Sequence, residues 1–228
     1  MKYSIITVCL NAETTIRDTI ESVLSQDCQD YEYIIMDGCS RDKTIDIIQE
    51  YIVDKRILFF SQHDNGLYDA MNTAIEKSSG DYIIFMNSGD LFYDNYVLKD
   101  MKEELNSDFV YGNVVRVFEN GKKLERYKNK KILFLLLMGK MMSHQVIFGR
   151  AAVLKEMKFN EEYTITADFD MIVRAYTSKR TFHYVDRIIS VVENINGISS
   201  KSENLEKMRE QDDKSLKRNL PLWYVLVF

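Results

Sequence analysis

Acidic residues follow three apolar, strand-like segments in the first half of the chain. Asp37 follows YEYIIM, Asp64 comes soon after residues 57–60, and Asp90 closes the turn NSGD after YIIFM. Such carboxylates can bind a hard divalent cation or accept a hydrogen bond from a ligand N–H group. Each also has an ordinary structural explanation, because Asp is common in turns and at helix N-caps. Ser88 and Gly89, just before Asp90, would let a ligand approach the backbone closely.

Two further acids and one histidine stand out in the second half. Asp168 and Asp170 lie in ITADFDM, at the start of an expected helix over residues 167–178. A general base at that place would be well positioned, although Asp near a helix N-terminus is also simply stabilising. His144 and Gln145 open a strand-like segment, where the histidine either lines a site or is a satisfied polar residue.

The elements that must position these residues alternate between two periodicities. Apolar runs at 3–9, 31–36, 57–60 and 82–86 predict strands, and amphipathic windows between them predict helices, with Asn11 and Ser40 as expected N-caps. This alternation indicates βαβ units and a mostly parallel sheet. Because ligands bind beyond the carboxyl ends of such strands, we expect Asp37, Asp64 and Asp90 along one sheet edge.

The second half is less regular. It predicts a hairpin of residues 109–118 and 123–127 around Asn120-Gly121, a strand over 144–148, a last strand over 188–192 and a charged helical tail over about 199–219. The chain of 228 residues fits one domain with an extension.

Composition excludes several classes of protein. The formal net charge of -5 argues against a general nucleic-acid binder. The three cysteines (Cys9, Cys28 and Cys39) lack CxxC spacing, so they predict reduced thiols in a cytoplasmic protein, not disulfides or a zinc site. The N-terminus is not typical of a signal peptide, and no apolar run is long enough to cross a bilayer.

The order of these motifs resembles glycosyltransferase family 2, in particular bacterial members that build surface polysaccharides. The resemblance rests on SIITVCLNAETTIRDTIESVLSQ, YEYIIMDGCSRDKT, QHDNGLYDAMNTAIEKSSGDYIIFMNSGD, SHQVIF and TADFDMIVRA. It implies an α/β fold of the GT-A type, a Rossmann-like nucleotide-diphospho-sugar transferase fold with a mostly parallel central sheet flanked by helices. It also implies inverting transfer of a sugar from a nucleotide-sugar donor, first of all a UDP-sugar, to a hydroxyl of a glycan or polyprenyl-linked acceptor.

The resemblance also implies roles for individual residues. Asp168 would be the catalytic base, with Asp170 as the alternative, and Asp90 would contact a divalent cation, Mn²⁺ or Mg²⁺, or the ribose-diphosphate. His144 and Gln145 would lie on the acceptor side. The expected nucleotide-binding residues are Thr7, Asn11, Asp37, Asp64, Asn65, Ser88 and Asp90.

Three positions depart from the family pattern. Asn87 replaces the first acid of the family's DxD motif, Ala167 replaces the Glu before Asp168, and Met71 stands where many members have Arg. No third metal ligand is assigned. These departures motivate the alternative of a degenerate protein that binds nucleotide or glycan without transfer. A nucleotidyltransferase would need a Gly-rich, basic loop after the first strand, and a dinucleotide oxidoreductase would need GxGxxG; CLNAETT is neither.

We expect a transferase domain over residues 1–200, with donor-binding residues 1–115 and acceptor residues 116–200, followed by a helical extension with an apolar tail over 201–228. Two apolar segments with basic neighbours, 132–138 and 220–228, are typical of interfacial binding or of ordinary packing. Lipid-linked acceptors favour the first interpretation, peripheral contact with the cytoplasmic face of the inner membrane.

Overall fold

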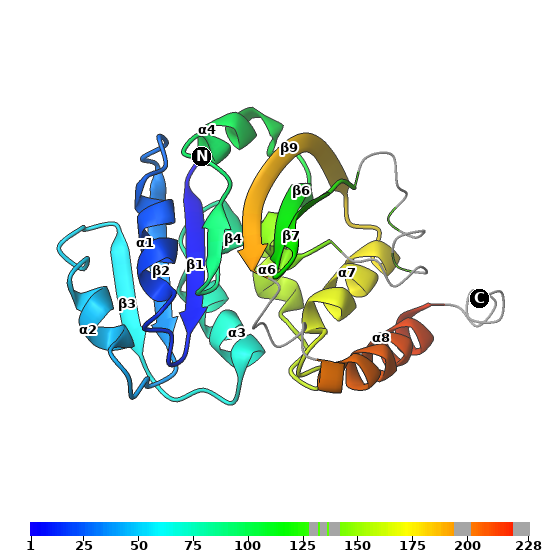
Figure 1. Ribbon diagram of the computed structural model, residues 1–228. Coiled ribbons are helices and arrows are strands. Elements are labelled where there is room, and N and C mark those ends of the chain that lie inside the picture. Colours follow the sequence, from blue (N-terminus) through cyan, green and yellow to red (C-terminus); the bar gives the residue numbers. More distant parts are fainter. Residues whose placement is uncertain (128–131, 133–135, 137–141, 194–201, 221–228) are drawn as a thin grey trace.

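The computed structural model describes residues 1–127, 132, 136, 142–193 and 202–220 (Figure 1). Four parallel strands form its N-terminal half: β1 (Tyr3–Cys9), β2 (Tyr31–Asp37), β3 (Ile57–Ser61) and β4 (Tyr82–Phe85). Every residue of β1, β2 and β4 is buried, as expected for strands covered on both faces. The connecting helices are α1 (Ile16–Leu24), α2 (Thr44–Gln49) and α3 (Leu67–Lys77).

The order of these strands creates a natural place for a ligand. Their order across the sheet is β3-β2-β1-β4, so the chain moves outward from β1 to β3 and then returns to the other side of β1. With right-handed crossovers, this reversal sends α3 to the face opposite α1 and α2. The loops after β1 and β4 therefore diverge at a topological switch point, where open α/β sheets bind ligands.

The C-terminal half extends the same sheet with mixed pairing. Strands β8 (Ile147–Arg150), β6 (Phe109–Phe118), β9 (Phe182–Glu193) and β5 (Asp90–Phe92) follow β4 in that order, and β7 (Gly121–Glu125) pairs with β6. Only the β6–β9 pair among them is parallel. The helical elements are α4 (Val97–Met101), η1 (Lys102–Glu104), η2 (His144–Val146), α6 (Ala151–Met157), α7 (Ala167–Thr177), η4 (Ser202–Asn204) and α8 (Leu205–Asn219).

Helix α8 lies beside α7 at the end of the described chain (Figure 1). Its composition is strongly polar, yet Ser215 is completely buried. A buried polar residue on such a helix indicates that hydrogen bonds, more than apolar contacts, join α8 to the domain.

Most of the expected elements are confirmed, and the errors are local. The parallel N-terminal strands, the hairpin around Asn120-Gly121 and the helix from Ala167 are present. The expected strand over 144–148 begins with the 3-10 turn η2, the last strand is longer than 188–192, and the charged helix begins at Leu205. The apolar segments 132–138 and 220–228 lie mostly outside the described residues, although Leu220 is buried.

Both N-cap predictions in the N-terminal half are wrong. Thr15, not Asn11, precedes α1, and Lys43, not Ser40, precedes α2. Asn11 instead has a φ of 50°, a left-handed conformation that Asn tolerates, and its side chain bonds across to the β2 loop. Side chains of this type bond readily to neighbouring loops, and here tertiary contacts took precedence over local capping.

Candidate active site

The turn after β4 continues the β1–β4 ladder beyond the strand. The Ser88 amide donates to the Val8 carbonyl over 3.3 Å, and the Asn87 side-chain carbonyl accepts from the Val8 amide over 3.3 Å. Gly89 has a φ of 96°, a conformation that other residues rarely adopt, and its amide donates to Thr19 Oγ1 over 2.9 Å. The turn is therefore held rigidly at the switch point, and Asp90 follows it.

Asp37 organises the neighbouring turn, after β2. It is only 1% exposed, and its carboxylate accepts from Ser61 Oγ over 2.7 Å and from the Ser40 amide over 3.1 Å. Ser40 Oγ also donates to Asp37 and accepts from the Asn11 amide over 2.8 Å. The carboxylate thus joins the loops after β1 and β2 to the end of β3, and its contact with a nucleobase stays a prediction.

Asp64 and Asn65 lie on the same edge. A Cβ atom at position 38 would lie 2.7 Å from Asp64 Oδ2, so Gly38 lets the loops after β2 and β3 come together. Asp64 accepts from the Gly66 amide over 2.9 Å, whereas the exposed Asn65 bonds to Asp69. The three acids that follow strands therefore lie along one edge of the sheet, as expected from their positions.

Thr7 lies below this edge and has no exposed surface. Its hydroxyl donates to the Met86 carbonyl over 2.5 Å and shares a hydrogen bond with the Tyr33 hydroxyl over 2.8 Å. Both contacts join buried strands. Burial therefore does not support the predicted contact of Thr7 with a nucleoside, and the residue supports the sheet beneath the loops.

Asp90 is buried at 6% exposure and accepts from Gln145 Nε2 over 3.0 Å. Burial raises its pKa to about 6, although the hydrogen bond from Gln145 acts in the opposite direction. A divalent cation would stabilise this carboxylate, so its environment suits a metal ligand. No group of three or more His, Cys, Asp or Glu side chains among the described residues could hold a metal on its own.

A chain of hydrogen bonds joins the turn after β4 to the start of α7. Asn87 Nδ2 lies 3.2 Å from His144 Nε2, and His144 Nδ1 lies 3.1 Å from Asp168 Oδ2. The Asn87 oxygen faces the Val8 amide, so its NH₂ group faces the imidazole and can only donate. Nε2 must then accept, and Nδ1 carries the proton that it donates to Asp168.

Tyr68 holds Asp168 from the opposite side. Its hydroxyl lies 2.7 Å from the Ile165 carbonyl and 3.2 Å from Asp168 Oδ1. Burial raises the pKa of Tyr68 well above its usual value, so the phenol stays protonated, and its one proton is shared between the Ile165 carbonyl and Asp168. Sequence reasoning gave Tyr68 no role. A usable signal was the spacing of two polar residues, Tyr68 and Asn72, on the buried face of α3.

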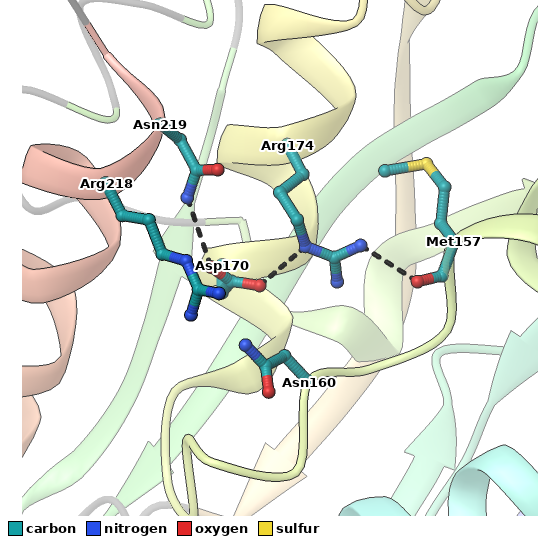
Figure 2. Close-up of a pocket in the computed structure, with 6 residues that line it drawn as sticks. All are labelled: Met157, Asn160, Asp170, Arg174, Arg218 and Asn219. Atoms are coloured by element: carbon teal, nitrogen blue, oxygen red, sulfur yellow. Dashed lines mark hydrogen bonds and ion pairs between the residues drawn. The ribbon is translucent and has the colours of Figure 1, made fainter.

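Asp170, the alternative base, has a structural role instead. Residues that are two positions apart on a helix lie on nearly opposite faces, so the side chain of Asp170 points away from that of Asp168. It is 1% exposed, pairs with Arg174 Nε over 2.6 Å and accepts from Ser215 Oγ over 2.8 Å. Figure 2 shows it between Arg174 and Asn219, in a pocket of about 410 Å³ between α7 and the end of α8. Its ion pair with Arg174 and its nearly complete burial argue against a proton-transfer role.

Comparison with known proteins decides the family. The family described as "Glycosyl transferase family 2" matches residues 4–170. The chain belongs to this family. Among its relatives, the PGL/p-HBAD biosynthesis glycosyltransferase of Mycobacterium bovis (strain BCG / Pasteur 1173P2) is 27% identical over 206 residues, which cover 87% of this chain and 79% of the relative. TuaG of Bacillus subtilis (strain 168), a glycosyltransferase named for teichuronic acid biosynthesis, is 33% identical over 128 residues, 54% of this chain and 51% of TuaG.

Solved structures confirm the GT-A-type α/β fold of this family member. S. aureus TarS 1-349 in complex with UDP-GlcNAc superposes with a TM-score of 0.78 at 21% identity, covering 97% of this chain and 68% of that one. The mannosyltransferase PcManGT from Pyrobaculum calidifontis, solved with GDP-Man and Mn²⁺, gives a TM-score of 0.66 at 13% identity, covering 94% and 61%. Within the described residues, no helix combines the length and apolar character needed to span a bilayer.

Proposed function

We propose that this glycosyltransferase inverts the anomeric centre of a UDP-sugar as it transfers the sugar to an acceptor hydroxyl in bacterial polysaccharide synthesis. The observation that supports it most is the hydrogen-bonded series Asn87–His144–Asp168, which joins the donor side at the switch point to a carboxylate at a helix start. The relatives named for PGL/p-HBAD biosynthesis and teichuronic acid biosynthesis support the pathway class, and the UDP-GlcNAc complex of TarS supports the donor class.

The donor would bind at the carboxyl edge of the sheet. We propose that the nucleoside lies against the loops after β1, β2 and β3, near Asn11, Asp37, Asp64 and Asn65, and that the diphosphate lies over the turn Asn87–Asp90. Asp90, with a neutral oxygen or the backbone of the turn, would hold a divalent cation, Mn²⁺ or Mg²⁺, together with the diphosphate. Such a cation neutralises charge on the leaving group.

Asp168 would act on the acceptor. The acceptor oxygen forms a bond to the anomeric carbon, the bond from that carbon to the diphosphate oxygen breaks, and the nucleoside diphosphate leaves with the electron pair. The acceptor proton passes to Asp168, whose side chain is held by Tyr68 and His144. These two donors orient the carboxylate before the reaction, which lowers the cost of reaching the reactive geometry. His144 and Gln145 would border the acceptor.

Membrane contact is a separate part of the proposal. The last turns of α8 carry the exposed basic residues Lys214, Lys217 and Arg218, and a lipid-linked acceptor would bring the protein to an anionic surface. Sedimentation with vesicles of phosphatidylglycerol and phosphatidylcholine at low salt should pull down the full chain. Protein that stays in the supernatant under those conditions would remove this part alone.

Calorimetry of UDP, GDP and dTDP, each with and without Mn²⁺, tests the donor site. We expect UDP to bind wild type in a metal-dependent manner and to bind Asp90→Ala at least tenfold more weakly. If all three nucleotides fail to bind wild type, the transferase proposal loses its basis and a degenerate binding protein is favoured. If the affinity for UDP changes neither when Mn²⁺ is removed nor in Asp90→Ala, the diphosphate binds away from this turn.

A further inference from the structure

Helix α8 lies outside residues 4–170, yet it touches the segment that carries Asp168. Gln211 Oε1 accepts from the backbone amides of Ile165 and Thr166, each over 3.1 Å. Gln211 Nε2 donates to Thr164 Oγ1, also over 3.1 Å. One side chain of α8 therefore binds three successive residues that lead into α7.

These contacts hold the residues just before helix α7, whose start lacks the usual side-chain cap. Thr166 occupies the N-cap position, but its side chain caps no amide of the helix; its hydroxyl lies 3.4 Å from Gln211 Oε1 instead. Helix starts leave backbone amides without partners, and side chains near the start usually satisfy some of them. Here the entry to α7 depends on a side chain from a helix about 45 residues further along the chain.

The same segment is held on its other side by Tyr68. The Thr166 amide donates to Gln211, and the Ile165 carbonyl of the same peptide unit accepts from the Tyr68 hydroxyl over 2.7 Å. Opposed anchors on one peptide leave it little freedom to rotate. Asp168 lies only three residues after Ile165, inside the first turn of α7. The position of its carboxylate therefore depends on the position of this peptide.

The register of α8 is fixed by a stripe of polar residues. Gln211, Ser215 and Asn219 follow one another at intervals of four, so they share one face of the helix. Ser215 Oγ and Asn219 Nδ2 both donate to Asp170 Oδ1, over 2.8 and 3.4 Å. Asp170 thus anchors the C-terminal part of α8, and Gln211 meets the start of α7 one turn earlier.

We propose that Gln211 is a positioning residue for Asp168, through its hold on residues 164–166, and that α8 is therefore part of the catalytic apparatus. This inference rests on the proposed role of Asp168 as the base. Asp212, the next residue, lies within electrostatic range of Asp168, as expected for a helix that packs beside the start of α7. Loss of the Gln211 contacts would let the start of α7 move, and displacement by about 1 Å can lower a catalytic rate about a hundredfold.

The test compares Gln211→Leu, Gln211→Glu and Glu210→Gln in the full chain. Leucine keeps the size but loses the acceptor, glutamate keeps an acceptor oxygen, and Glu210 is an exposed neighbour that serves as the control. With UDP-GlcNAc and Mn²⁺, measured as UDP release, Gln211→Leu should lower kcat at least tenfold while the KM for donor and the Kd for UDP stay within twofold. Gln211→Glu should recover part of kcat, and Glu210→Gln should match wild type.

Hydrogen–deuterium exchange provides a readout that needs no turnover. Peptides spanning 160–170 should exchange faster in Gln211→Leu, whereas peptides from β1 to β4 should be unchanged. Unchanged exchange at 160–170, unchanged kcat, or a parallel loss of UDP binding would each overturn the inference. Failure of the proposed function looks different, because wild type itself would then neither bind UDP nor release it from UDP-GlcNAc.

Discussion

His144 donates from Nδ1 to the Asp168 carboxylate over 3.1 Å, and both side chains are less than one-fifth exposed. Asn87 determines which nitrogen of this imidazole carries the proton, because its NH₂ group faces Nε2 and leaves the proton on Nδ1. A neutral histidine therefore orients Asp168 while leaving its negative charge in place. That arrangement suits a carboxylate that must take a proton.

Asp168→Asn should abolish transfer and leave nucleotide binding intact. Asparagine keeps the shape of the side chain but cannot accept a proton from an acceptor hydroxyl, so we expect kcat to fall by about a thousandfold or more. UDP release from UDP-GlcNAc and calorimetry of UDP on the same preparation measure the two effects. Normal turnover by this variant would show that the base is a different group.

Asn87→Asp restores the first acid of the DxD motif, and we expect it to impair the enzyme. An aspartate can only accept, so it would draw a proton onto His144 Nε2 and leave an imidazolium between two carboxylates. Asp168 beside that cation becomes a weaker proton acceptor. We expect tighter Mn²⁺–UDP binding together with a kcat about tenfold lower.

The matched control for this change is Asn95→Asp, outside the candidate site. It makes the same substitution at an exposed position after β5. It should leave the balance between binding and turnover as in wild type. If Asn87→Asp instead increased kcat, the neutral tautomer of His144 would have no part in the reaction.

Much of the fold could be predicted from the sequence because its signals are local. Apolar runs and amphipathic windows determine the strands and helices, and strand ends place Asp37, Asp64 and Asp90 on one edge. The role of Asn11 was missed because a turn residue binds whichever partner the tertiary fold brings near. Asn11 thus bonds to the Arg41 amide instead of starting α1.

The environment of Asp168 was much harder to predict. Its partners Tyr68 and His144 come from elements 100 and 24 residues away, and no local spacing reveals such a contact. The separation of Asp168 from Asp170 was readable in principle, because residues two apart on a helix face opposite sides. Likewise the interval of four between Gln211, Ser215 and Asn219 marks one face of α8, but the sequence does not say what that face meets.

Glu32→Gln should destabilise the protein without affecting the candidate site. Glu32 lies near the start of β2, at the opposite end from Asp37, and accepts from Ser4, Ser79 and the Gly80 amide. Burial raises its pKa, but these hydrogen bonds outweigh burial and lower it to about 2. We expect a loss of about 1–2 kcal/mol at pH 7 by urea unfolding, with UDP affinity unchanged.

The pH dependence of that loss follows from the direction of the shift. A lowered carboxyl pKa stabilises the folded state above the ordinary value of 4.5, and this contribution disappears as pH falls toward 2. The difference between wild type and Glu32→Gln should therefore shrink over that range. A constant difference would mean that shape, not charge, matters at position 32.

Asp212→Asn should stabilise the protein at alkaline pH. Burial raises the pKa of Asp212 from 3.8 to about 7, and among the described residues its buried Oδ1 atom has no hydrogen-bond partner. A raised pKa in an acid means that the folded state loses stability as pH rises from about 4 to 7, because the unfolded chain ionises first. A neutral amide removes this loss, and partial exposure limits the gain to on the order of 1–2 kcal/mol.

Thermal unfolding across the pH range tests this prediction, with a variant of the neighbouring residue as the control. Asp212→Asn should melt above wild type at pH 8, and the two curves should converge near pH 4. Asp213→Asn is the matched control, because Asp213 is exposed and should leave the melting temperature unchanged at both pH values. An equal gain from both variants would reflect net charge on α8. A loss at pH 8 from Asp212→Asn alone would show that the ionised carboxylate is favoured in the fold, with a cationic group paired to it.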